Sequence, residues 1–242
     1  MSHRPVILVI ENEEGAGPAQ LEASATAAGL ELDVRSAAGG TDAIPERLSD
    51  AAGLVVLGAS YDVADAPERP HLFRVMDLFR EADATGRPAL GICLGGQLAS
   101  EALGGEVTKA PQPEIGWVLV RPTEEGREDP VARSLGDGRP LFQWHHDVFT
   151  TPPGAVQVLT SNEYPSQGFR LGTVWGVQSH PEADPGILAE WCSLPEARAE
   201  LEAANVDPGR LIEEAREFSP GAKLLLDAWC ALAVKKTVPG ER

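Results

Sequence analysis

PALGICLGGQLASEALGG, residues 88–105, reads as a short buried strand, a tight turn and a helix. The turn carries Cys93, with Gly91 two positions before it and Gly95 two positions after it. This spacing is typical of the nucleophile elbow of α/β hydrolases, with cysteine in place of serine, and its strained backbone favours neighbours without side chains. The cysteine would stand at a helix N-terminus, which favours the thiolate anion. The alternative is a buried, inert cysteine beside a glycine-rich helix start.

Strands and helices alternate on the N-terminal side of this elbow. The apolar and amphipathic patterns predict, in order, strand 6–10, helix 18–28, strand 30–34, strand 53–57, helix 70–85 and strand 89–92. Such alternation is typical of a parallel sheet with helices on both faces, whose sites form beyond the carboxyl ends of the strands. The loops after the strand at 53–57 and after a late strand at 174–178 should therefore lie at the same edge as Cys93.

From residue 106 the pattern changes to short strands separated by turn residues. Strands are predicted at 107–109, 117–121, 141–144, 156–160, 168–171 and 174–178, a charged surface loop at 123–140, and helices within 185–205, 211–218 and 222–234. We therefore expect an α/β fold, with a mixed, mainly parallel sheet, helices on both faces and a small antiparallel section. A single domain should span residues 1–242, with a core at about 5–183 and a helical C-terminal extension at about 184–242.

The composition restricts the class of partner. A formal net charge of −17 argues against nucleic acid and against an acidic membrane surface. No apolar run long enough to span a membrane and no signal peptide are found, so we expect a cytoplasmic protein. Cys93, Cys192 and Cys230 form an odd count without metal-ligand spacing, and we expect neither a disulfide framework nor a metal site.

A second stretch, WGVQSHPE at residues 175–182, predicts a strand that ends in a polar loop. The loop holds His180 and, two residues later, Glu182. A thiol nucleophile needs a base to take its proton, and a carboxylate commonly orients that base. Such a sequence on its own is most often a surface turn, but beside a cysteine elbow in an α/β chain it predicts a Cys93–His180–Glu182 triad.

Acyl transfer creates an oxyanion, which two backbone N–H groups can stabilise. Leu94, the residue after the nucleophile, supplies one such group. The loop Gly58-Ala59, which follows the third predicted strand, is placed to supply the other. The alternative for Gly58 is a simple turn at the end of a strand.

The motif GICLGGQ at 91–97, followed by HPE at 180–182, resembles the class I (triad) glutamine amidotransferases. The chain is most similar to stand-alone members that resemble the glutaminase domain of GMP synthase. The stretches EIGW at 114–117, FQWHHD at 142–147 and QGFR at 167–170 agree, and the resemblance covers roughly residues 6–182. It implies the flavodoxin-like fold of that family.

The resemblance also implies residue roles. Cys93 would be the nucleophile, His180 the general acid and base and Glu182 its orienting partner, while Ala59 and Leu94 would donate N–H groups to the oxyanion. The resemblance further implies substrate-binding positions at Gly58, Gln97, His145 and Asp147. For residues 145–147 the alternative is a polar turn.

Three positions depart from the family pattern. Ala59 stands where the family usually has the second glycine of the oxyanion loop, so this loop should switch conformation less freely. Ser60 stands where proline is frequent, and Ser179 stands where phenylalanine is frequent, which should alter the packing beside His180.

The resemblance implies hydrolysis of the γ-amide of glutamine through a Cys93 thioester, giving glutamate and ammonia without a cofactor. The sequence has neither a pyrophosphate-binding loop nor a Walker motif, so we expect a separate synthetase subunit to receive the ammonia. One alternative is a stand-alone hydrolase of γ-glutamyl peptides or conjugates, and another is a non-catalytic binding protein on the same fold. A homodimer, the ammonia acceptor and the role of the C-terminal helices are left open.

Overall fold

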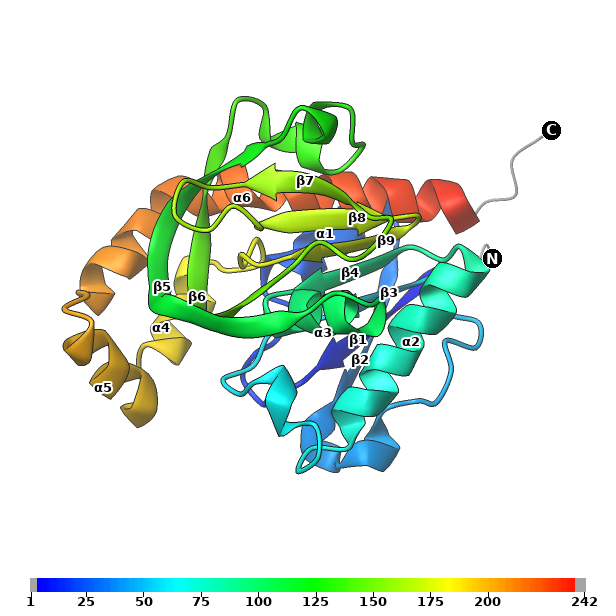
Figure 1. Cartoon of the computed structure of the whole chain (residues 1–242), viewed down its shortest axis with the longest axis horizontal. Coiled ribbons are helices and arrows are strands. Elements are labelled where there is room, and N and C mark those ends of the chain that lie inside the picture. The colour runs from blue at the N-terminus through cyan, green and yellow to red at the C-terminus, as the bar shows by residue number, and fades with distance from the viewer. Residues whose placement is uncertain (1–3, 238–242) are drawn as a thin grey trace.

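The computed structural model describes residues 4–237, which form one nine-stranded sheet flanked by helices (Figure 1). The strands are β1 Val6–Glu11, β2 Glu31–Ser36, β3 Gly53–Val56, β4 Ala89–Ile92, β5 Val107–Pro122, β6 Arg139–Phe149, β7 Val156–Thr160, β8 Gly168–Leu171 and β9 Val174–Val177. The α-helices are α1 Gln20–Ala28, α2 His71–Thr85, α3 Leu94–Ala102, α4 Pro185–Trp191, α5 Pro195–Ala203 and α6 Pro208–Thr237.

The strand order is β2-β1-β3-β4-β9-β8-β7-β5-β6. The pairs from β2 to β9 are parallel, and the remaining pairs are antiparallel. This confirms the predicted fold class, a mixed and mainly parallel sheet with an antiparallel section. Because β4 lies between β3 and β9, the segments that follow these three strands leave the sheet side by side at one edge.

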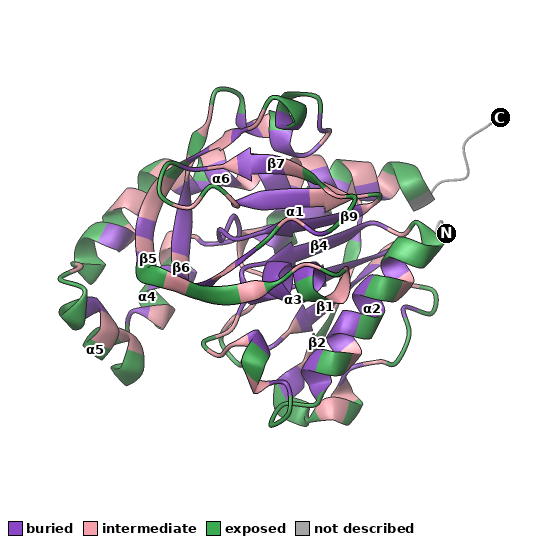
Figure 2. Ribbon diagram, in the orientation of Figure 1, coloured by how far each residue is buried: buried purple, intermediate pink, exposed green. Residues whose placement is uncertain are grey.

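Alternating residues of the buried strands supply the apolar core on the two faces of the parallel section (Figure 2). On one face, Ile7 and Val9 of β1 belong to a cluster with side chains of α1 and α6. On the other face, Leu8 and Ile10 belong to a cluster with side chains of α2 and α3. A third cluster joins Phe142 of β6 to apolar side chains of α4, α5 and the first half of α6.

The prediction of separate strands at 107–109 and 117–121 was wrong, because both belong to the 16-residue strand β5. Pro111 and Pro113 lie between the two predicted strands. Proline adopts the extended backbone of a strand, however, and is tolerated where a ladder is irregular. The pairing of β5 with β6 shifts register between Lys109 and Glu114, around these prolines.

The segment at 123–140, predicted to be a surface loop, connects β5 to β6 and is only partly exposed. It contains the short 3-10 helices η4 Glu125–Arg127 and η5 Ala132–Leu135. Val131, Ala132 and Leu135 are buried in the same cluster as α6. These three apolar side chains attach the segment to the core.

The separate helices predicted at 211–218 and 222–234 form one continuous helix, α6, with Pro220 inside it. Proline lacks the N–H that a helix interior needs, so a single helix through Pro220 is not what local propensity favours. Buried side chains on both sides of it, Leu211 and Ala215 before and Leu225 and Trp229 after, hold the helix against the rest of the chain. No helix within residues 4–237 combines the length and the apolar composition that crossing a membrane requires.

Candidate active site

Cys93 lies in a strained turn between β4 and α3. Its φ of 51° and ψ of −111° form a backbone conformation that residues with side chains rarely adopt. The flanking glycines are required, because a Cβ on Gly91 would collide with the carbonyl oxygen of Gly95, and a Cβ on Gly95 with that of Val56. The N–H of Cys93 donates to the carbonyl oxygen of Val177 in β9 (2.9 Å). Cys93 is 4% exposed and stands at the N-terminus of α3.

His180 and Glu182 lie in the loop after β9 and form a buried pair, with Nδ1 of His180 2.7 Å from Oε1 of Glu182. Burial lowers the pKa of His180, but the Glu182 carboxylate and the Cys93 sulfur together raise it more strongly, so that the pKa is about 10. The N–H of His180 donates to the carbonyl oxygen of Phe142 (2.7 Å). Since Nδ1 faces Glu182, Nε2 is the ring nitrogen left to exchange a proton with a thiol.

Gly58, in the loop after β3, lies next to both Cys93 and His180. A Cβ on Gly58 would lie 2.8 Å from Cε1 of His180 and 3.5 Å from the Cβ of Cys93. The structure therefore brings Gly58, Cys93, His180 and Glu182 together at the carboxyl edge of the sheet. This is the edge that the alternating pattern predicted.

Two further groups contact the sulfur of Cys93, and sequence reasoning identified neither. The thiol donates to the carbonyl oxygen of Trp144 in β6 (3.7 Å), and Nε2 of Gln178 donates to the sulfur (3.9 Å). Oε1 of Gln178 is buried without a partner among the described residues. Gln178 could have been found as a buried polar residue at the end of an apolar strand, whereas a backbone carbonyl such as that of Trp144 leaves no signal in the sequence.

The two proposed oxyanion donors have free backbone N–H groups. Within residues 4–237, neither Ala59 nor Leu94 uses its N–H in a hydrogen bond to another residue. Ala59 has no positive φ, so its methyl group causes no backbone strain in this conformation. The following residue, Ser60, donates from its N–H and its Oγ to the carboxylate of Glu13 (2.7 and 2.8 Å), which ties this loop to the segment after β1.

His145 and Asp147 lie within β6 and not in a polar turn. The carbonyl oxygen of Asp147 accepts hydrogen bonds from Nδ1 of His145 and from Nε2 of Gln97, both at 3.1 Å. Nε2 of His145 contacts the carboxylate of Glu114 (3.0 Å). All four side chains are buried. Gln97, His145 and Asp147, three of the four predicted substrate-binding residues, thus connect α3 to β6, and their role toward a substrate stays a prediction.

Gln20, at the start of α1, holds the loop that carries His180 and Glu182. Its N–H donates to the carbonyl oxygen of Glu182 (3.3 Å). Its Nε2 donates to the carbonyl oxygens of Pro181 (2.7 Å) and of Ser219 in α6 (3.1 Å). The residue before it, Ala19, has a φ of 43°. Sequence reasoning missed Gln20, because a single glutamine at a helix start belongs to no recognisable motif.

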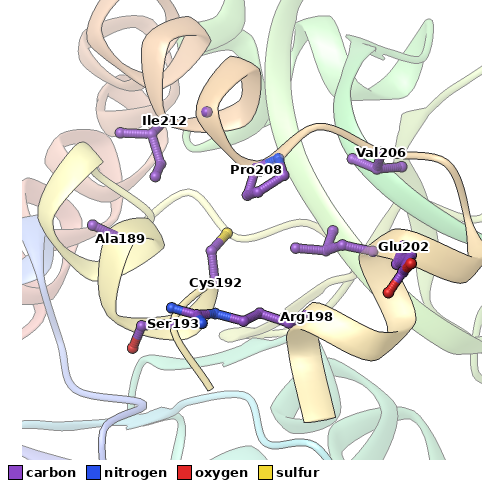
Figure 3. A pocket seen from close by; sticks show the side chains of 10 residues that line it. Ala189, Cys192, Ser193, Arg198, Glu202, Val206, Pro208 and Ile212 are labelled. Atoms are coloured by element: carbon purple, nitrogen blue, oxygen red, sulfur yellow. The ribbon is translucent and has the colours of Figure 1, made fainter. Parts of the chain in front are cut away.

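The other two cysteines are free and buried. Burial raises the pKa of Cys192, and burial together with Asp227 raises that of Cys230 to about 12. Cys192 lines a pocket of about 560 Å³ between α4, α5 and α6, to which none of the predicted site residues contributes (Figure 3). Among the residues that the structure describes, no group of three or more His, Cys, Asp or Glu side chains could hold a metal ion.

The comparison with protein families gives a match to the model described as "Glutamine amidotransferase class-I" over residues 19–189. A glutamine-hydrolyzing GMP synthase subunit from Sulfurisphaera tokodaii is 40% identical over 101 residues, which are 40% of this chain and 52% of that protein. A gamma-glutamyl-L-1-hydroxyisopropylamide hydrolase from a Pseudomonas species is 29% identical over 189 residues, which are 71% of this chain and 62% of that protein.

The matched region thus spans only about half of the length of the curated GMP synthase subunits, and 29% of a glutamine-hydrolyzing GMP synthase from Aeropyrum pernix. Among solved structures, a glutamine amidotransferase from Thermotoga maritima superposes with a TM-score of 0.87 at 28% identity. The superposition covers 97% of this chain and 100% of the other. The likeness to that structure therefore includes the helices α4–α6, which follow the loop of His180 and Glu182.

Proposed function

The chain belongs to the class I glutamine amidotransferase family, and from this premise we propose that it hydrolyses γ-glutamyl amides with Cys93 as the nucleophile. One observation carries the proposal. A cysteine on a strained elbow faces a buried His180–Glu182 pair in which the pKa of the histidine is raised to about 10. A histidine that is held protonated beside a cysteine can supply the proton that the departing amine needs.

In the first half of the proposed reaction, the Cys93 sulfur attacks the γ-carbonyl carbon, and the carbonyl oxygen becomes an oxyanion. The free N–H groups of Ala59 and Leu94 stabilise that oxyanion, and losing one such donor typically costs about 3 kcal/mol of transition-state stabilisation. His180 gives its Nε2 proton to the departing nitrogen, the C–N bond breaks, and ammonia or an amine leaves. The product is a γ-glutamyl thioester on Cys93.

In the second half, His180 takes a proton from a water molecule, which attacks the thioester carbonyl. The C–S bond breaks, glutamate is released, and Cys93 and His180 return to their starting protonation states. Glu182 keeps the imidazole oriented through both halves, since its Oε1 lies 2.7 Å from Nδ1. No cofactor takes part in either half.

The proposed substrate is glutamine, with the ammonia passing to a separate synthetase subunit. The similarity to the Sulfurisphaera GMP synthase subunit supports this choice. The second candidate is a γ-glutamyl alkylamide or peptide, hydrolysed without a partner. It is favoured by the similarity to the Pseudomonas gamma-glutamyl-L-1-hydroxyisopropylamide hydrolase, which extends over 71% of this chain. The same triad serves both substrates, because they differ only in the amine that leaves.

The test is release of glutamate from glutamine, a γ-glutamyl alkylamide and a γ-glutamyl dipeptide by the purified chain. In parallel, a chloroketone analogue of glutamine is used to label the thiols. We expect turnover and labelling at Cys93, and loss of both in Cys93→Ala. Cys192→Ala is the matched control and should behave like the wild type, because burial keeps the Cys192 thiol protonated.

The outcomes separate the candidates. Turnover of glutamine alone supports the glutaminase, and turnover of the alkylamide or dipeptide alone supports the γ-glutamyl hydrolase. Labelling of Cys93 without turnover indicates that a partner is needed. If Cys93 is neither labelled nor required for any turnover, the catalytic proposal is wrong and the chain is a binding protein on this fold.

A further inference from the structure

The helices after the acid–base loop, α4 to α6, contact the strand that lines the nucleophile. Glu200 of α5 reaches β6 with both carboxylate oxygens. Its Oε2 accepts a hydrogen bond from Nε1 of Trp144 (3.0 Å), and its Oε1 lies 2.6 Å from Nε2 of His146. Trp144 and His146 are two positions apart in a strand, so they share one face of β6. Glu200 binds that face through the hydrogen bond to Trp144, while its Oε1 lies close to His146 without forming a hydrogen bond.

The opposite face of the same strand is held from the sheet core. His145 bonds to Glu114 of β5, and Gln97 of α3 bonds to the carbonyl oxygen of Asp147. Between these anchors lies the carbonyl oxygen of Trp144, which accepts the hydrogen bond from the Cys93 thiol. Trp144 also pairs with Ile115 of β5 in the sheet, and α5 adds a side-chain hydrogen bond on one face of this strand.

A second contact from these helices reaches the acid–base residue. The indole of Trp191, the last residue of α4, meets the ring of His180 edge-on, with the ring centroids 5.2 Å apart. Nε1 of Trp191 donates to the carbonyl oxygen of Gly15, in the segment after β1 (3.0 Å). Both members of the proposed Cys93–His180 pair thus have a neighbour that α4 or α5 positions.

We propose that Glu200 is a positioning residue of the active site, which fixes β6 at Trp144 and thereby orients the Cys93 sulfur. The proposal rests on the function proposed above. It assigns the helical extension to the catalytic machinery, so that the core and the extension act as one domain. A displacement of about 1 Å at a reacting group can lower a rate 100-fold, so a loosened strand next to the nucleophile should have a measurable effect.

Glu202, which lines the pocket between α4, α5 and α6, provides a matched control for Glu200 (Figure 3). Glu202 lies two residues after Glu200 on the same helix, but its side chain lines the pocket between α4, α5 and α6, away from the face that meets β6. Replacing Glu202 changes the charge and the helix propensity of α5 by the same amount as replacing Glu200. Only the Glu200 replacement removes the contacts to Trp144 and His146.

The experiment measures kcat, KM and the second-order rate of Cys93 labelling by the chloroketone in four proteins: wild type, Glu200→Ala, Glu200→Gln and Glu202→Ala. We expect Glu200→Ala to lower kcat and the labelling rate about 10-fold with a smaller change in KM, since a hydrogen bond to a charged group is lost. Glu200→Gln keeps an acceptor for Nε1 of Trp144 and should stay within about threefold of the wild type. Glu202→Ala should stay within about twofold.

A double variant tests whether Glu200 acts through Trp144. Trp144→Phe removes the indole N–H that Glu200 binds. In the Glu200→Ala background it should therefore lower the labelling rate by less than it does alone. Thermal unfolding of each variant shows whether a loss of rate merely follows a loss of folded protein.

The proposal is overturned if Glu200→Ala and Glu202→Ala have the same labelling rate, or if the effects of Glu200→Ala and Trp144→Phe are additive. Failure of the proposed function looks different. In that case the wild-type protein itself neither turns over a γ-glutamyl amide nor is labelled at Cys93.

Discussion

Gly58 shows how closely the proposed reaction depends on single atoms. Its backbone conformation is open to any residue, but a Cβ there would lie 2.8 Å from Cε1 of His180. We expect Gly58→Ala to displace the imidazole and to lower kcat/KM about 100-fold, with little change in the free energy of unfolding. Gly17→Ala is the control, because a Cβ at that position would lie 3.8 Å from its nearest neighbour, an oxygen of Glu11. Equal activity of the two variants would contradict this account of Gly58.

The protonation of His180 links the active site to stability. Its pKa is raised from 6.5 to about 10, because the opposing effect of burial is outweighed by Glu182 and the Cys93 sulfur. A raised pKa stabilises the fold fully below pH 6.5, and this contribution is lost as the pH rises through the folded-state value of about 10. The free energy of unfolding should therefore fall between pH 7 and 10 more steeply in the wild type than in His180→Gln. Denaturant unfolding at several pH values would measure both slopes, and parallel slopes would count against the raised pKa.

Among the helices, α6 contains an interior proline, and its packing against the core keeps it helical. Pro220 is exposed and interrupts the hydrogen bonding of a 30-residue helix. We expect Pro220→Ala to raise the free energy of unfolding by up to about 3 kcal/mol, which is what proline costs relative to alanine in a helix interior. Activity should not change. Urea unfolding measures the effect, with the exposed neighbour Glu217→Ala as control, and a stability unchanged from the wild type would mean that α6 is already broken at Pro220.

Elements with local signals could be predicted from the sequence, and those that depend on distant contacts could not. The boundaries of β4 and the start of α3 follow from an apolar run and from glycines within a few residues of Cys93. The continuity of α6 through Pro220 depends on packing against residues far away in the chain, so its sequence suggested two helices.

The residues of the candidate site also fall into those with a local sequence signal and those that depend on distant contacts. Cys93, His180 and Glu182 stand in short, recognisable motifs, and the parallel sheet order explains why they meet. Gln20 and Glu200 act through hydrogen bonds to residues that lie 161 and 56 positions away, and neither belongs to a local pattern. Trp144 contributes a backbone carbonyl, which every residue possesses.

For the whole molecule, the decisive feature is that α6 completes the core beneath the parallel strands. Trp229 is fully buried in the cluster that also contains Ile7, Val9 and Val55. We expect Trp229→Ala to lower the free energy of unfolding by about 3–5 kcal/mol. The loss should shift one cooperative transition, seen alike by far-UV circular dichroism and by tryptophan fluorescence. Two transitions, of which only one shifts, would show that the extension folds as a separate unit and would contradict the proposal of a single domain.

The place of Trp229 in that core also sets an order of events during protein synthesis. A ribosome makes the strands β1, β3 and β4 long before it makes α6, so one apolar face of these strands, which α1 covers only in part, has to wait for α6 to complete its cover. During this interval the nascent chain exposes Ile7, Val9 and Val55 to other chains and to chaperones. Translation that stalls between α3 and α6 would therefore release a chain that already carries the cysteine elbow but is prone to aggregate.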